Sequence, residues 1–170
     1  MKFDKDLKIA FTFGITIYII YKIMQKLTIQ TPTGSLKMRN DTNGKGHFGA
    51  SRGERDHKGY DLLNEVVGSN VTSPISGKIT RVMNVYKDNS EFVGVEIIGT
   101  YGINTPVMVK MFYVQLLSDT IVGSEVERGS TIGVQQDIAK HWGGGMKNHV
   151  HLELYINGKL KNPKNYLNLL

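Results

Sequence analysis

The chain of 170 residues contains no cysteine. A disulfide framework is therefore excluded, and any bound metal ion must be held by histidine and carboxylate side chains rather than by thiolates. Lysine and arginine number 21 against 15 acidic residues, a formal net charge of +6, yet no dense basic stripe is present. This charge suits an anionic surface such as a membrane or a cell-wall polymer, and equally an ordinary soluble surface. It gives no support to nucleic-acid recognition.

Long apolar runs are also scarce, and the longest is IAFTFGITIYIIY at residues 9–21, 13 residues without a charge. Thirteen helical residues span about 20 Å, less than the roughly 30 Å hydrocarbon core of a bilayer. Extended to residues 7–27, with the flanking lysines reaching outward, the segment becomes long enough to cross. No small-x-small cleavage pattern follows it. We expect an uncleaved membrane anchor in residues 1–27; a signal peptide and a helix buried in a partner are the alternatives.

The rest of the chain divides into a linker and a β domain. Residues 28–46 are rich in glycine, threonine and asparagine and show no apolar period, which is typical of a linker. From residue 47 onward, short alternating patterns separated by turn residues predict strands, most strongly at 77–86, 92–99, 107–117 and 149–156. No long amphipathic helix and no βαβ alternation interrupts them. The sequence therefore predicts an all-β domain over residues 47–170, an antiparallel sheet around one core.

The last of these strands, HVHLELYI, carries two histidines one residue apart. In a strand, alternate residues face opposite sides. His149, His151 and Glu153 therefore share one face, and the aliphatic residues share the other. We expect the aliphatic face to cover the core and the histidine face to be turned to solvent. Such a pair is found either on a polar surface strand or at a site of metal binding or proton transfer.

A second cluster of this kind lies in RDHKGYDLL, where His57, Gly59 and Asp61 share a parity. An extended segment would present the imidazole and the carboxylate on one face, with glycine leaving space between them. Together with one or both histidines of the pair, they would make a three-ligand zinc site with an open position for water, which is the catalytic kind. Magnesium and calcium prefer more oxygen ligands. Spacing alone leaves open which histidine binds the metal, and whether His57 and Asp61 instead form a surface pair.

These stretches resemble a known family. HKGYD and HVHLE resemble the HxGxD and HxH motifs of the lysostaphin-type zinc endopeptidases, which cut peptidoglycan cross-links. TSPISGKI, VERGSTIG and NGKLKNPKNYL resemble further family segments, and the match covers residues 48–167. The resemblance implies a zinc ion (Zn²⁺) as cofactor and peptidoglycan cross-link peptides as partner. It implies His57, Asp61 and His151 as zinc ligands and His149 as general base. Glu153 is then either a hydrogen-bond acceptor behind a ligand or a solvated carboxylate.

The chain departs from the family at a catalytic position. Active members carry a second histidine in a Tyr-x-His-Leu motif, and here that stretch is YVQL, with Gln115 in place of the histidine. Glutamine can donate a hydrogen bond but cannot carry a proton, and the loss of one such donor costs about a hundred- to a thousandfold in rate. His141, in a glycine-rich loop, could fold back and replace it, or be a surface or substrate contact. Tyr113 of the same motif is a further candidate for substrate binding.

Two functional classes follow. The stretches VKMFYV and HVHLE also resemble leukocyte cell-derived chemotaxin, a zinc-binding protein of the same fold that lacks that histidine and acts by binding. The sequence thus predicts a membrane-anchored zinc endopeptidase with an altered set of catalytic residues, or a zinc-containing binding module that recognises cell-wall or protein ligands. We expect the domain on the extracytoplasmic side of a bacterial envelope, or alternatively in the membrane of a lipid-containing bacteriophage virion.

Overall fold

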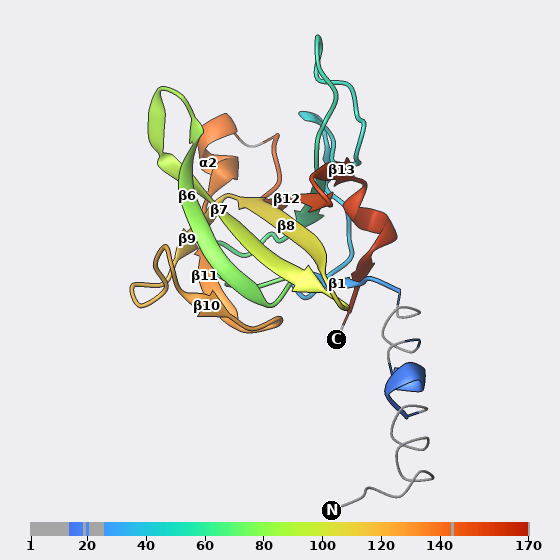
Figure 1. Ribbon diagram of the computed structural model, residues 1–170. Coiled ribbons are helices and arrows are strands. Elements are labelled where there is room, and N and C mark those ends of the chain that lie inside the picture. Colours follow the sequence, from blue (N-terminus) through green and yellow to red (C-terminus); the bar gives the residue numbers. More distant parts are fainter. Residues whose placement is uncertain (1–13, 19, 21–25, 144, 170) are drawn as a thin grey trace, which may run out of the picture.

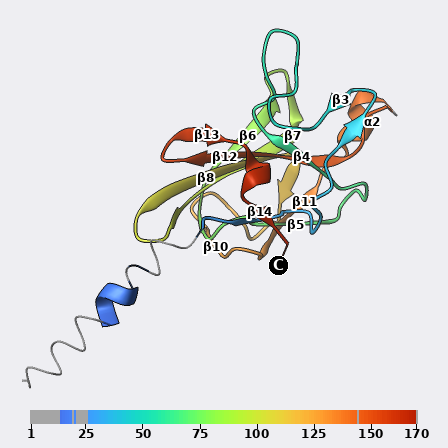
Figure 2. The ribbon, with the colours of Figure 1, turned by 90° about the vertical axis from the view of Figure 1, so that its right-hand side faces the viewer.

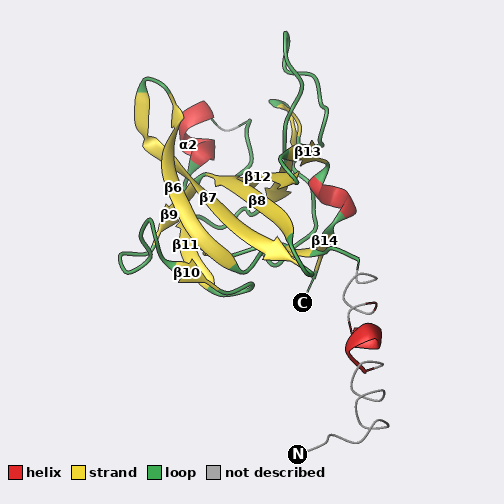
Figure 3. Cartoon of the chain, in the orientation of Figure 1, coloured by secondary structure: helices red, strands yellow, loops and turns green. Residues whose placement is uncertain are grey.

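The computed structural model describes residues 14–18, 20, 26–143 and 145–169 (Figure 1). Its two short helical elements in the β domain are α2 (Ile138–Trp142) and the 3₁₀-helix η1 (Pro163–Asn165). Figure 3 shows that strands, and not helices, make up the regular structure of the domain apart from these two short elements. In chain order they are β1 (Ile29–Gln30), β2 (Asn40–Asp41), β3 (Gly44–Lys45), β4 (Tyr60–Leu63), β5 (Asn70–Thr72), β6 (Gly77–Tyr86), β7 (Asn89–Tyr101), β8 (Thr105–Phe112), β9 (Val114–Leu116), β10 (Glu125–Val126), β11 (Thr131–Gln135), β12 (His149–Ile156), β13 (Lys159–Lys161) and β14 (Leu167–Asn168).

The largest sheet has seven strands in the order β10-β6-β7-β8-β12-β13, with β4 paired to β12 beside β13. All its pairs are antiparallel, and a smaller antiparallel sheet has the order β5-β11-β9. The two sheets lie on opposite sides of the core, with β12 and β13 above and β5 and β11 below in Figure 2. The predicted antiparallel all-β domain is thus confirmed, and the parallel pair of β1 with β14 is a small exception.

Alternation along the strands builds this core. In β8, Val107, Val109 and Met111 are buried, whereas the residues between them are half-buried. Leu152 and Leu154 of β12 are fully buried on the same side, and Val71 and Ile132 meet them from the smaller sheet. Because each strand of the large sheet commits one parity to the core, the other parity is free to carry functional groups.

The stretch 28–46, expected to be a linker, makes close contacts with the domain. Ile29 is fully buried in the core, and β1 pairs with β14 near the end of the chain. Arg39 is also buried, and its backbone N–H donates to the carbonyl of Asp61 at 2.9 Å. Part of this stretch therefore supports the strand that carries the predicted metal ligands.

The expected membrane anchor lies largely outside the described residues, because residues 1–13, 19 and 21–25 are not described. Residues 14–18 are helical. Within the part of the chain that the structure describes, no helix is both long enough and apolar enough to cross a membrane.

Candidate metal centre

The position of β12 between two strands brings the predicted ligands together. His151 lies opposite Asp61 of β4 on one side and opposite Phe112 of β8 on the other. The histidine face of β12 is covered as a result: His149, His151 and Glu153 are only 3%, 9% and 7% exposed. The expectation that this face is turned to solvent is wrong, because surrounding loops and side chains close over it.

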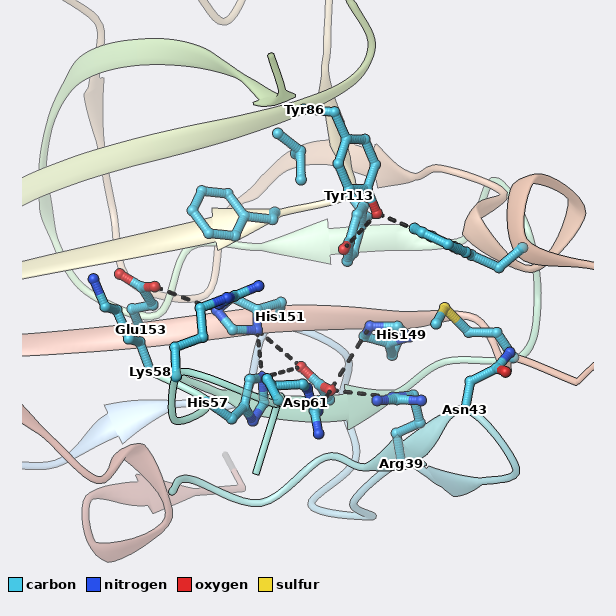
Figure 4. A pocket seen from close by; sticks show the side chains of 16 residues that line it. Arg39, Asn43, His57, Lys58, Asp61, Tyr86, Tyr113, His149, His151 and Glu153 are labelled. Carbon is cyan, nitrogen blue, oxygen red and sulfur yellow. Dashed lines mark hydrogen bonds and ion pairs between the residues drawn. The ribbon is translucent and has the colours of Figure 1, made fainter. Parts of the chain in front are cut away.

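Three ligand atoms converge at this point of the sheet (Figure 4). His57 Nε2 lies 3.1 Å from Asp61 Oδ1 and 2.9 Å from His151 Nδ1, and His151 Nδ1 lies 2.9 Å from Asp61 Oδ1. Tetrahedral zinc with bonds of about 2.0–2.1 Å places its ligand atoms about 3.3–3.4 Å apart. A small outward movement of each side chain would therefore give one face of a zinc tetrahedron.

The other ring nitrogens of the two histidines have the partners that zinc ligands need. His57 Nδ1 lies 2.8 Å from the carbonyl oxygen of His47, so this nitrogen carries the proton and Nε2 keeps its lone pair. His151 Nε2 faces Glu153 Oε1 at 3.5 Å, which leaves the lone pair on Nδ1. Zinc-binding histidines almost always donate their second N–H to a carbonyl or carboxylate in this way. The residues present thus fit zinc.

Glu153 is the acceptor behind His151. It is buried, and its Oε2 accepts a hydrogen bond from the Tyr155 hydroxyl at 2.7 Å. Burial raises the pKa of Glu153, but the hydrogen bonds from His151 and Tyr155 outweigh burial and lower it overall. The alternative of a solvated carboxylate is therefore wrong.

Asp61 is the most strongly stabilised anion of the site. Burial opposes its charged form, but the close contacts of the carboxylate with His151 and His57, and then the proximity of His149, hold its pKa well below the usual range. Its second oxygen, Oδ2, is bound by Arg39 Nε at 3.1 Å and lies 3.7 Å from Arg52. The carboxylate is therefore ionised and has one oxygen turned toward the two histidines, as a metal ligand requires.

Arg39 is a residue of the site that the sequence did not reveal. Its guanidinium bridges Asp61 and Asp41, with 2.7 Å to Asp41 Oδ1, and all three side chains are at most 3% exposed. Asp41 Oδ2 in turn accepts the backbone N–H of Lys147, at the entry to β12, at 2.9 Å. Arg39 lies in the stretch expected to be a linker, where a single arginine belongs to no pattern that could have pointed to it.

His149 stands beside the three-ligand cluster. Its Nε2 lies 3.9 Å from Asp61 Oδ2, and its Nδ1 lies 2.7 Å from the carbonyl oxygen of Lys147. The Nδ1 proton therefore points to that carbonyl and the Nε2 lone pair points toward the cluster. Burial lowers the pKa of His149 to about 4, although Asp61 acts in the opposite sense. The imidazole is thus neutral near pH 7 and able to accept a proton at Nε2.

The cluster lies in a cavity of about 490 Å³ with two chemically different walls. Tyr86, Tyr113 and Trp142 form an aromatic wall, in which Trp142 Nε1–H donates to the Tyr86 hydroxyl at 3.0 Å and the two tyrosine hydroxyls are 3.1 Å apart. The opposite wall is basic. The lining residues are Arg39, Asn43, Arg52, Arg55, His57, Lys58, Asp61, Val85, Tyr86, Phe112, Tyr113, Trp142, Met146, His149, His151 and Glu153.

Tyr113 enters the cavity through an unusual backbone conformation. Its φ of 67° is in the left-handed region, which is uncommon for a bulky residue and is typical of functional sites. The turn separates β8 from β9 and sets the Tyr113 ring edge-on to His149, with 5.2 Å between the ring centroids. The predicted substrate contact Tyr113 thus lines the same cavity as the metal cluster.

The structure does not bring the other two predicted residues into this lining. Gln115 is exposed on β9. His141 stacks on Tyr86, with 5.6 Å between centroids and 22° between planes, and packs edge-on against Phe92. The exposed His141 thus packs on a ring of the aromatic wall without lining the cavity.

Comparison with known proteins agrees with this geometry. No family model matches the chain. Leukocyte cell-derived chemotaxin-2 of Bos taurus is 30% identical to it over 128 residues, which cover 75% of this chain and 76% of the relative. The chain belongs to the lysostaphin-type peptidase fold family. The motifs HKGYD and HVHLE of this lysostaphin-type domain are the two segments that supply the converging ligand atoms.

Solved structures show the same fold at low sequence identity. Helicobacter pylori Csd3 superposes with a TM-score of 0.58 at 19% identity, over 85% of this chain and 36% of that chain. The catalytic domain of the prophage-encoded protein EnpA of Enterococcus faecalis gives 0.51 at 19% identity, over 80% and 96%. A zinc containing peptidase from Vibrio cholerae gives 0.50 at 18% identity, over 82% and 40%. The lysostaphin-type domain thus spans about a third of the Csd3 chain.

Proposed function

We propose that this lysostaphin-type domain is a zinc-dependent endopeptidase that hydrolyses amide bonds in the peptide cross-links of peptidoglycan. The observation that carries the proposal is the cluster of three ligand atoms, 2.9–3.1 Å apart, in a cavity that also holds the neutral imidazole of His149. Solved structures of the same fold include a zinc containing peptidase and the catalytic domain of EnpA, which supports this choice.

His57 Nε2, Asp61 Oδ1 and His151 Nδ1 would hold the zinc ion. When bound, zinc supplies a Lewis acid that polarises a carbonyl and lowers the pKa of water to about 7. The chain's own contribution is proton transfer and orientation. His149 Nε2 accepts a proton as general base, while the Lys147 carbonyl, 2.7 Å from Nδ1, keeps the ring in the required tautomer. Asp61 Oδ2, 3.9 Å away, favours the imidazolium that forms, which can then protonate the leaving amine.

A binding module that keeps the zinc is the second candidate. The resemblance of YVQL to the family motif assigns Gln115 to the position of the second catalytic histidine, and its side chain is exposed on β9, so it offers no obvious replacement. The 30% identical relative is a chemotaxin by name. In this reading the cavity recognises a cell-wall or protein ligand without cutting it. His149 discriminates only weakly between the two candidates: a pure binding protein has no need of a buried base beside the metal ligands, yet the HVHLE stretch that carries it also resembles the chemotaxin.

Location is part of the same proposal. Residues 7–27 would anchor the chain in a lipid membrane, supported by the 13 uncharged residues at 9–21 and by the lysines on both sides. The domain would then act on the extracytoplasmic side of a bacterial envelope, or from the membrane of a lipid-containing bacteriophage virion. In both places a tethered hydrolase meets peptidoglycan directly.

The decisive experiment is digestion of purified cross-linked peptidoglycan by the zinc-loaded protein, followed by chromatography of the products. We expect cross-linked fragments to be converted to monomers with a new free amine. His149→Ala is the matched control, because it removes the base and leaves the three ligands in place. No product after long incubation at high protein concentration, together with measurable binding to wall fragments, would establish the binding module instead.

A further inference from the structure

The cavity is lined by more cationic side chains than carboxylates, and its carboxylates already have partners. Four cationic side chains line it, Arg39, Arg52, Arg55 and Lys58, against the carboxylates of Asp61 and Glu153. Both carboxylates are already committed. Asp61 binds His57, His151 and Arg39, and Glu153 binds His151 and Tyr155. The cavity therefore has an excess of positive charge, which a bound divalent metal would increase.

Two of the four cations are also structural. Arg39 is buried between Asp41 and Asp61, and Arg52 donates to the carbonyl oxygens of Lys45 and Ser51 and lies 3.7 Å from Asp61. Arg39 thus holds the carboxylate of the metal cluster, and Arg52 links that carboxylate to the backbone at Lys45 and Ser51. Arg39 and Arg52 are therefore not the cations that would bind an anionic group of a ligand.

Arg55 and Lys58 are different. Both are exposed, and both lie in or beside the loop that an isolated bridge between Ser51 and Asp56 closes. Among the described residues, no ion pair links either side chain to a carboxylate. Both line the cavity from exposed positions, although Glu54 and Asp56 flank Arg55 in the chain. An anionic group of a ligand is the natural counterpart of such a pair.

The aromatic wall, formed by Tyr86, Tyr113 and Trp142, carries no charged side chain. Figure 4 shows Lys58 near His57 and Glu153, while Tyr86 and Tyr113 lie on the other side of the metal cluster. Lys58, three residues after Arg55, thus lies on one side of the ligand atoms, and Tyr86 and Tyr113 lie on the other, while the ring of Phe112 stacks on His151. A substrate that spans the cluster would meet both walls and could be held in only one direction.

From this polarity we infer that the cavity selects a peptide with a free carboxylate on the Arg55 and Lys58 side of the metal cluster. An uncharged part of the same peptide packs against Tyr86 and Trp142 on the other side. The identity of the ligand as a wall peptide rests on the proposed function, whereas the requirement for a carboxylate rests on the charges of the cavity alone. The two cations act as specificity-determining residues and leave the chemistry to the metal cluster and His149.

The test compares two fluorescent forms of one cross-linked stem-peptide dimer, with its carboxylates free or converted to carboxamides. Binding to the full chain is measured by fluorescence anisotropy. Exposed ion pairs contribute little individually, so two of them give a preference of about three- to tenfold for the carboxylate form. The preference should fall as salt shortens the Debye length from about 10 Å at 0.1 M to about 3 Å at 1 M. It should persist after chelation of the metal, since the cations and not zinc produce it.

Variants assign the preference to particular residues. Arg55→Gln and Lys58→Gln should each weaken binding of the carboxylate form by about two- to threefold and leave the carboxamide form unchanged. Lys78→Gln is the matched control. It removes the same charge from an exposed position on β6, the strand that carries Tyr86, about 26 Å of strand length away.

Equal binding of the two peptide forms would overturn the inference. Equal weakening by Lys78→Gln would overturn it as well, because the attraction would then come from the net charge of the chain rather than from the cavity. Neither result bears on cleavage. If the carboxylate preference is found and no product forms from either peptide, the inference holds and the proposed enzymatic function fails.

Discussion

The guanidinium of Arg39 holds the outer oxygen of the metal-facing carboxylate, with 3.1 Å between Arg39 Nε and Asp61 Oδ2. Asp61 is thereby fixed with Oδ1 turned toward His57 and His151. Burial lowers the pKa of Arg39, but Asp61 and Asp41 outweigh burial and raise it overall, so the guanidinium stays charged. The orientation of this proposed zinc ligand thus depends on a residue 22 positions earlier in the chain.

Arg39→Gln should therefore weaken zinc binding. Loss of a group that orients a metal ligand costs about ten- to a hundredfold in metal affinity. Competition with a chromophoric chelator measures the change. Removal of one partner of a buried ion pair also destabilises a fold, by about 3–5 kcal/mol, so thermal unfolding is recorded alongside to confirm that the variant is folded. Arg81→Gln, at an exposed pair with Glu96, serves as the control. A folded Arg39→Gln protein with unchanged zinc affinity would show that Arg39 does not position Asp61.

The ligand set gives a second prediction. Elemental analysis should find about one zinc per chain, as expected for a single three-ligand site. His57→Ala and His151→Ala should each abolish tight binding, because each removes one of the converging atoms. His149→Ala should retain most of the metal, since its Nε2 points at Asp61 Oδ2 from outside the cluster at 3.9 Å. Metal loss in the His149 variant with retention in the His151 variant would exchange the roles of ligand and base.

A third prediction concerns Gly59, which leaves no room for a side chain beside the His151 ring. A Cβ atom at position 59 would lie 2.5 Å from His151 Nε2 and 2.6 Å from the carbonyl oxygen of Leu152. Gly59→Ala should destabilise the fold by about 1–3 kcal/mol, the usual cost of overpacking, and should displace the His151 ring. Denaturant unfolding and zinc titration measure the two effects. Gly53→Ala is the comparison: its Cβ would meet nothing within 4 Å, although its φ of 76° adds backbone strain. Equal zinc affinity in both variants would mean that the ring accommodates the extra methyl group.

The sequence predicted those parts of the molecule that depend on alternation and on local spacing. The parity of His149 and His151 places both on one face of β12, and the register between β12 and β4 sets Asp61 opposite His151, while His57 and Gly59 lie in the segment that leads into β4. Alternation reveals which side chains share a face. It cannot reveal whether that face is open, and for this reason the burial of Glu153 was missed.

Other parts of the site arise from contacts between distant segments. Arg39 reaches Asp61 from a stretch without apolar periodicity, and the aromatic wall joins Tyr86 of β6, Tyr113 after β8 and Trp142 of α2. No spacing in the sequence links these residues, because tertiary packing alone brings them together. The left-handed conformation of Tyr113 is a further example, since a bulky residue there contradicts the local preference.

The anchor remains a prediction and has its own test. Full-length protein should stay with membranes after washing with high salt and alkali, because a spanning helix is held by burial of its apolar residues. The shortened chain should begin at Lys26, since its carbonyl accepts a hydrogen bond from the Tyr101 hydroxyl and Ile29 is part of the core. We expect this shortened protein to remain in the supernatant. Release of the full-length chain by alkali would point to a peripheral or partner-buried helix instead.

Gln115 offers the prediction that separates the two functional classes. If the domain is an enzyme weakened at one position, its metal ligands and the His149 base are already in place. Because position 115 is exposed and outside the cavity lining, Gln115→His raises the rate of cross-link cleavage only when its imidazole turns into the cavity. The gain should then be about ten- to a thousandfold, the range expected for one group that stabilises a developing oxyanion. Zinc content should stay constant, because position 115 lies on β9, outside the three-ligand cluster. Gln115→Ala is the matched control and should give no gain.

The position of Gln115 makes the result informative in either direction. Its side chain is exposed, whereas Tyr113, two residues earlier, already lines the cavity. If cleavage is absent from both the native chain and Gln115→His, the cavity lacks other groups that orient a substrate, and one histidine cannot replace them. That outcome favours the binding module. If the native protein cleaves and Gln115→His loses activity, then glutamine has a positive role here. The oxyanion donor of this domain would then have to be sought among the hydroxyl groups of the aromatic wall, beginning with Tyr113.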